Sequence, residues 1–93
     1  MIVGTLRVRL LLREARTLKD KRQVLQSIKD RLRQSFNVSV AEIEAQDNPR
    51  SIVLGLAIVC NEANPIKQTF SEIVNSLKAH PIAEFVDDEM ELI

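Results

Sequence analysis

The chain has 93 residues, of which 45% are hydrophobic and 28% are charged, and its 13 basic and 13 acidic side chains cancel. This length fits one domain, residues 1–93, and excludes a second core, while a single cysteine, Cys60, excludes a disulfide framework and suits a reducing cytoplasm. Residues 1–36 carry a charge of +7 and residues 37–93 carry −7. Such a split indicates either a basic binding surface or two halves that neutralise each other in the fold.

Residues 2–12 alternate between apolar and mixed positions, which predicts a strand with one apolar face. Arg7 and Arg9 interrupt this run, so we expect neither a secretion signal nor a membrane span.

Thr17 can cap a helix that runs to about Phe36. At 100° per residue its apolar stripe consists of Val24, Leu25, Ile28, Leu32 and Phe36. Lys21 lies in the same sector, and we expect its side chain to extend past the rim of the core.

Residues 38–46 predict a short strand with apolar side chains at both parities, so either the strand is bulged or both of its faces are covered. Residues 46–50 form a turn. Residues 51–60 are apolar on both faces, which is typical of a central strand.

Asn64 and Pro65 predict the N-cap and first residue of a second helix, which His80 and Pro81 end. Its apolar stripe consists of Ile66, Phe70, Ile73, Val74 and Leu77. In a last strand, residues 83–92, one face carries Val86, Met90 and Leu92, and the other carries Asp87, Glu89 and Glu91.

This βαββαβ order predicts an α+β, ferredoxin-like fold with a four-stranded antiparallel sheet and both helices on one face. The first and third strands are then central, and the last strand lies beside the first. Arg7 and Arg9 would face away from the helices, next to the acidic face of the last strand. Cross-strand ion pairs worth roughly 0.2–1 kcal/mol each would then explain part of the charge split structurally.

The first helix carries a polar stripe at intervals of three and four residues, made of Lys19, Arg22, Gln26, Lys29 and Arg33. These cations span about 20 Å of helix and could follow the phosphates of a nucleic acid. With Lys21 at the first turn, the candidate nucleic-acid-binding residues are Lys19, Lys21, Arg22, Lys29 and Arg33. The three phenylalanines suit the core, so no aromatic is left to stack bases, and a solvated helix face is the alternative interpretation.

Catalytic motifs are absent. The sequence has no glycine-rich phosphate loop, one histidine and no cysteine and histidine pair at metal-ligand spacing, so we expect no enzyme, no cofactor and no metal site. We assign His80 to a helix end and Cys60 to the core. The acidic run from Asp87 to Glu91 is most simply an edge that is solvated or paired with arginine.

The helix-free face of the sheet would present an apolar patch of Val3, Leu11, Val53, Gly55, Ala57 and Val59. Exposed apolar patches usually mark partner surfaces. Small residues such as Gly55 and Ala57 permit close approach of two sheets, so a homodimer is the first hypothesis for this face and a partner protein the second.

Several segments resemble one family over nearly the whole chain. They are Thr17-Leu18-Lys19-Asp20-Lys21-Arg22, Phe36 to Glu42, Gln46-Asp47, Leu54-Gly55-Leu56-Ala57 and Cys60-Asn61-Glu62-Ala63. In collinear order they resemble the YlxP-like family of small bacterial proteins, domain of unknown function family 503. The family often has bulky residues after the Gln-Asp pair, where this chain has Asn48 and Pro49.

The resemblance implies a ferredoxin-like fold, a bacterial cytoplasmic protein, and genes near those for translation initiation and ribosome maturation. Two classes of function follow. The first is a non-catalytic protein that contacts ribosomal RNA or a ribosomal particle through its basic first helix. The alternative is a homo-oligomeric interaction module that uses the open sheet face and binds no nucleic acid.

Overall fold

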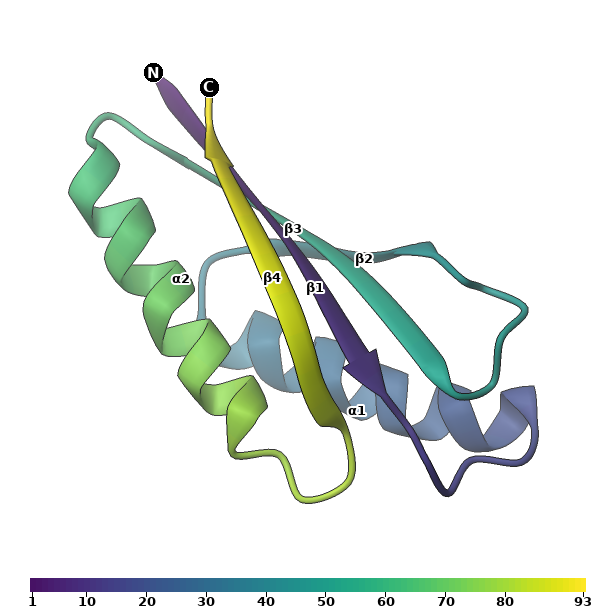
Figure 1. The fold of residues 1–93 in the computed structure, drawn as a ribbon. Coiled ribbons are helices and arrows are strands. Elements are labelled where there is room, and N and C mark those ends of the chain that lie inside the picture. Colours follow the sequence, from purple (N-terminus) through teal and green to yellow (C-terminus); the bar gives the residue numbers. More distant parts are fainter.

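The computed structural model describes residues 1–93 and has the expected α+β, ferredoxin-like architecture (Figure 1). The elements are β1 (Ile2–Leu11), α1 (Leu18–Ser35), β2 (Ser39–Glu44), β3 (Ser51–Cys60), α2 (Ala63–Lys78) and β4 (Glu84–Leu92). The strands form one antiparallel sheet in the order β2-β3-β1-β4. Both helices cover one face, which leaves the other face open.

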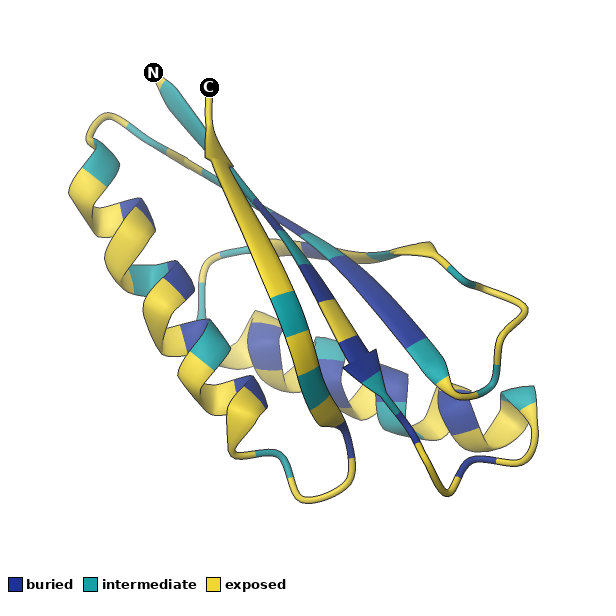
Figure 2. Cartoon of the chain, viewed as in Figure 1, coloured by how far each residue is buried: buried dark blue, intermediate teal, exposed yellow.

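The hydrophobic core lies between the sheet and the helices (Figure 2). Every second residue of β1 faces it, since Leu6, Val8 and Leu10 are buried. Gly4 continues this face at the point where α2 packs against β1. A Cβ atom at Gly4 would collide with Ile66, so this glycine permits the close approach of α2.

A capping box begins α1. Thr17 Oγ1 accepts a hydrogen bond from the Asp20 backbone N–H, while the Asp20 carboxylate accepts from the backbone N–H groups of Arg16 and Thr17. The N-cap prediction for Thr17 is therefore confirmed. Leu25, Ile28 and Leu32 of the predicted stripe are buried.

The second helix begins earlier than predicted. Its N-cap is Glu62, which makes no side-chain capping hydrogen bond, and not Asn64. Pro65 still lies in the first turn, where the missing N–H removes no helical hydrogen bond.

The second strand is bulged, which decides between the two alternatives left open by its sequence. Glu42 lies opposite Leu54 and Glu44 opposite Val53, so Ile43 is the extra residue. The bulge moves Glu44 to the open face of the sheet. Ile43 covers Gly55 there, because a Cβ on Gly55 would lie 2.7 Å from Ile43 Cγ2.

A second irregularity lies in β4, where Asp87 pairs with Arg9 and Phe85 with Leu10. The extra residue, Val86, is 51% exposed, so its predicted place on the apolar face beside Met90 was wrong. The bulge instead lets Phe85 pack against the core.

Neither helix combines the length and the apolar character that crossing a membrane requires. No group of three or more His, Cys, Asp and Glu side chains is arranged to hold a metal ion.

Candidate functional site

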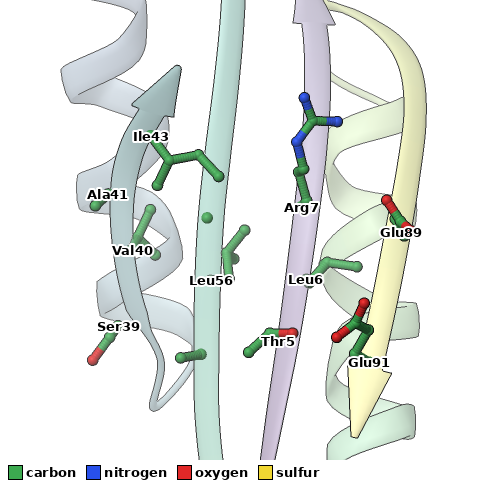
Figure 3. Close-up of a pocket in the computed structure, with 12 residues that line it drawn as sticks. Thr5, Leu6, Arg7, Ser39, Val40, Ala41, Ile43, Leu56, Glu89 and Glu91 are labelled. Carbon is green, nitrogen blue, oxygen red and sulfur yellow. The ribbon is translucent and has the colours of Figure 1, made fainter.

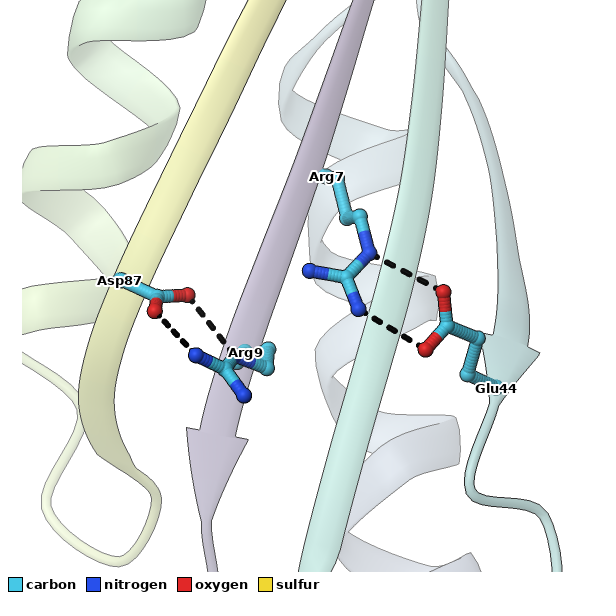
Figure 4. A network of polar contacts seen from close by, with 4 residues as sticks. All are labelled: Arg7, Arg9, Glu44 and Asp87. Carbon is cyan, nitrogen blue, oxygen red and sulfur yellow. Dashed lines mark hydrogen bonds and ion pairs between the residues drawn. The ribbon is translucent and has the colours of Figure 1, made fainter.

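Two arginines of β1 are neutralised on the open face (Figure 4). Arg9 donates from Nε to Asp87 Oδ1 at 3.0 Å and from its terminal nitrogen to Oδ2, so the predicted ion pair with β4 is confirmed. Arg7 lies opposite Glu89 but does not pair with it. It crosses β3 to Glu44, donating at 3.1 and 2.8 Å, because the β2 bulge turns that carboxylate toward it.

A third arginine follows the same pattern. Arg13 Nε donates to Glu84 at 2.6 Å. The hydrogen bonds from these arginines lower the pKa values of Glu44, Glu84 and Asp87 below their ordinary range. Each carboxylate therefore stays ionised and compensates one cation of the basic third of the chain.

Lys21 is removed from the candidate nucleic-acid-binding set, because its residue is 1% exposed. Its ammonium lies 2.7 Å from Glu42 Oε2 and donates to the carbonyls of Ala45 at 2.7 Å and Asn48 at 2.9 Å. Glu42 Oε2 is buried and accepts no hydrogen bond, so the Lys21 ammonium acts as its counter-charge. The side chain turns inward to hold the β2–β3 loop instead of extending past the rim of the core.

The remaining candidates lie on the surface of α1. Lys19 and Arg22 are exposed, Lys29 is half-buried, and none of the three forms an ion pair. Arg33 is exposed and donates one hydrogen bond to the backbone carbonyl of Val40, at 2.9 Å. It therefore keeps its charge unneutralised while it ties α1 to β2.

The basic charge that remains unpaired is confined to one segment. Of the ten cations in residues 1–36, Arg7, Arg9, Arg13 and Lys21 have carboxylate partners. The six others all lie between positions 16 and 33, and they are Arg16, Lys19, Arg22, Lys29, Arg31 and Arg33. Ion pairs within the fold thus neutralise the basic residues of β1 and Arg13 of the loop that follows it, but they leave α1 with a net positive charge.

The open face contains a shallow groove of about 520 Å³ (Figure 3). Small residues, including Thr5, Gly55 and Ala57, line its floor. Ile43 forms one side, and Glu89 and Glu91 of β4 form the other.

The predicted apolar patch on this face is smaller than its sequence indicated. Val53 lies between Arg9 and Glu44 in register and is only 3% exposed, and Gly55 lies under Ile43. Val59 is 64% exposed. Val3, Leu11 and Ala57 are half-buried, so Val59 is the one exposed residue of the predicted patch.

His80 has the expected place at a helix end. Its Nδ1 accepts hydrogen bonds from the backbone N–H groups of Ile82 and Ala83, at 3.1 and 2.9 Å. Burial, together with the positive charge of Arg31, lowers the pKa of His80. Cys60 is half-buried and packs against the core.

Sequence reasoning did not find the ion pairs of Glu42 and Glu44. Glu44 reaches Arg7 only because of the bulge at Ile43 that precedes it. The only local signal was the mixed parity of the apolar residues in β2.

The chain is similar in sequence to proteins of one family. The sequence profile described as "Protein of unknown function (DUF503)" matches residues 3–90. The chain is also 28% identical, over 83 residues, to "Uncharacterized protein YlxP" of Bacillus subtilis (strain 168), which covers 89% of this chain and 90% of the relative. The family expected from the sequence motifs is thereby confirmed.

Proposed function

Because the chain belongs to the DUF503 family of proteins of unknown function, its own surface must indicate what it binds, and we propose that it contacts RNA through α1. One observation carries the proposal. The cations of α1 other than Lys21 lack carboxylate partners, whereas every arginine of β1 has one. Unpaired cations attract phosphates through the release of condensed counterions, without reading the sequence of bases.

The contact surface consists of Lys19, Arg22, Lys29 and Arg33. These residues recur at helical spacing over about 20 Å, so one side of α1 can meet several phosphates. Arg33 also holds α1 against β2 at its C-terminal end. Ribosomal RNA, in a cytoplasmic ribosomal particle, is the RNA that we propose.

The test is sedimentation of the tagged protein with ribosomal particles from a lysate, at low and high salt. We expect migration with a small-subunit or precursor fraction at low salt and its loss at high salt. Lys19→Glu with Arg22→Glu should abolish this migration. The matched control is Lys67→Glu with Lys78→Glu on α2, which changes the net charge equally and should preserve it.

Retention of the α1 double variant on particles, or equal loss in both double variants, would contradict the assignment of RNA binding to α1. Migration at the top of the gradient at both salt concentrations would remove the ribosomal proposal altogether.

The second candidate function is homo-oligomerisation through the open sheet face, which exposed Val59 and the groove over Gly55 and Ala57 favour. Association through apolar surface should change little with salt, unlike phosphate binding. A monomer in analytical ultracentrifugation at micromolar concentration would exclude it. A dimer that Val59→Lys dissociates would support it.

A further inference from the structure

The outer edge of β4 has unused backbone groups. It is an edge strand in the order β2-β3-β1-β4, and the backbone of Ile93 extends its pairing with β1. Val3 and Ile93 exchange both hydrogen bonds, at 3.1 and 2.8 Å. Because hydrogen-bonded and non-hydrogen-bonded pairs alternate along an antiparallel ladder, the N–H and C=O groups of Asp88, Met90 and Leu92 point away from β1.

The same strand carries negative charge that nothing in the fold neutralises. Asp88, Glu89 and Glu91 have no ion-pair partner, and Arg7, opposite Glu89, turns to Glu44 instead. Glu89 and Glu91 lie on the open face, where they form the side of the groove. Their backbone groups face β1, so a strand added at the outer edge would meet these two residues in non-hydrogen-bonded pairs, in which side chains approach most closely.

The other edge strand of the sheet, β2, is less suited to pairing with an added strand. β2 has six residues and a bulge, and Arg33 of α1 already donates to its Val40 carbonyl. A second copy of the chain suits β4 poorly, since antiparallel β4–β4 pairing centred on Met90 would set Glu89 of each copy opposite Glu91 of the other. Like charges directly opposite each other destabilise strand pairing.

We propose that β4 binds an extended basic peptide segment of a partner protein, which adds to the sheet as a fifth, antiparallel strand. Two lysines or arginines separated by one residue would lie opposite Glu89 and Glu91. The residue between them would pair its backbone with Met90. Main-chain hydrogen bonds supply affinity in this mode, and the alternating side chains supply selectivity. This site is separate from α1 and does not depend on RNA binding.

The probe is a fluorescent nine-residue peptide of alternating Lys and Val, with blocked ends, titrated against the full chain and followed by anisotropy. Two peptides serve as controls. Alternating Glu and Val reverses the charge, and alternating Lys and Pro keeps the charge but removes the N–H groups that β4 would bind. We expect binding of the Lys-Val peptide only.

Protein variants locate the site. Glu89→Lys with Glu91→Lys should weaken binding about tenfold or more. Glu62→Lys at the N-cap of α2 with Glu72→Lys on α2 is an equal change in charge and should change binding about twofold or less. Met90→Pro removes an outward N–H but no hydrogen bond to β1, so it should keep the circular dichroism spectrum and abolish binding.

If the Lys-Pro peptide bound as tightly as the Lys-Val peptide, charge attraction alone would explain binding, and strand addition would be overturned. Equal weakening in the two glutamate double variants would overturn the location. No binding of the Lys-Val peptide would overturn the proposal and leave the acidic residues as protection of an exposed edge against aggregation. Since no RNA is present, each outcome is independent of the function proposed for α1.

Discussion

The arginines of β1 and the cations of α1 come from the same basic third of the chain but have different surroundings. Arg7 and Arg9 each find a carboxylate, because neighbouring strands place acidic residues within reach. Of the two acidic residues of α1, Asp20 accepts backbone hydrogen bonds in the capping box, and Asp30 accepts from Gln26. A basic residue is free to bind a ligand only if no carboxylate of the fold neutralises it. The number of basic residues in a segment does not decide this.

Among these basic residues, Lys21 is the one buried cation of α1, and its substitution should cause the largest loss of stability. Lys21→Met leaves Glu42 buried without its counter-charge and two loop carbonyls without their donor. We expect the free energy of unfolding to fall by about 3 kcal/mol, measured by urea denaturation. Lys19→Met, on the exposed face, should change it by less than about 0.5 kcal/mol. Similar values for the two variants would mean that Lys21 belongs with the exposed cations.

The ion pairs of Arg7 and Arg9 should affect how the stability of the fold depends on acidic pH. The lowered pKa values of Glu44 and Asp87 mean that the fold favours their ionised forms. Their contribution to stability is complete above their ordinary pKa values of about 4 and is lost as the pH falls through the lower folded values. Arg7→Gln with Arg9→Gln should therefore flatten the loss of stability as the pH falls below about 4, measured by urea denaturation at each pH. An unchanged slope would contradict the pairing.

The helix that presents the unpaired cations depends on its cap. Thr17→Ala removes the side-chain acceptor for the Asp20 N–H and should lower the free energy of unfolding by about 1 kcal/mol. The exposed Ser27→Ala in the middle of α1 is the control and should change stability by a few tenths of a kcal/mol. An equal loss in both variants would show that the cap adds nothing.

The smallest effect should appear at Arg31, whose charge acts on the only histidine. Arg31 lowers the pKa of His80, so Arg31→Gln should raise that pKa, and Lys19→Gln should leave it unchanged. A nuclear magnetic resonance titration of the His80 ring protons measures both. A pKa that does not move in Arg31→Gln would place this cation away from His80.

The sequence predicted the fold because apolar alternation and helical spacing are local patterns. They gave the six elements, the core face of α1 and the pairing of Arg9 with Asp87. The mixed parity of β2 left a bulge open as one of two alternatives, but the bulge in β4 was not expected. An extra residue reverses the face of every residue after it, so these two positions decided which side chains could meet. Glu44 therefore reached Arg7 unexpectedly, and Val86 left the predicted apolar face.

The candidate site was predicted less completely than the fold. The helical wheel placed Lys21 in the buried sector, but its contacts with Ala45 and Asn48 depend on how the β2–β3 loop folds over α1. A long side chain at the edge of a core can point outward or inward, and only the tertiary structure decides which. Lys19 and Arg22 lie on the exposed side that the same wheel gave them.

The most direct test of the account compares the salt dependence of RNA binding in two triple variants of equal charge. One changes Lys19, Arg22 and Lys29 to Gln, and the other changes Arg7, Arg9 and Arg13 to Gln. With a fluorescent ribosomal RNA fragment, we expect the α1 variant to reduce the slope of log K against log salt by about 2 or more, and the strand variant to leave it nearly unchanged. Equal reductions, or no change in the α1 variant, would contradict the claim that the unpaired cations of α1 form the RNA-binding surface.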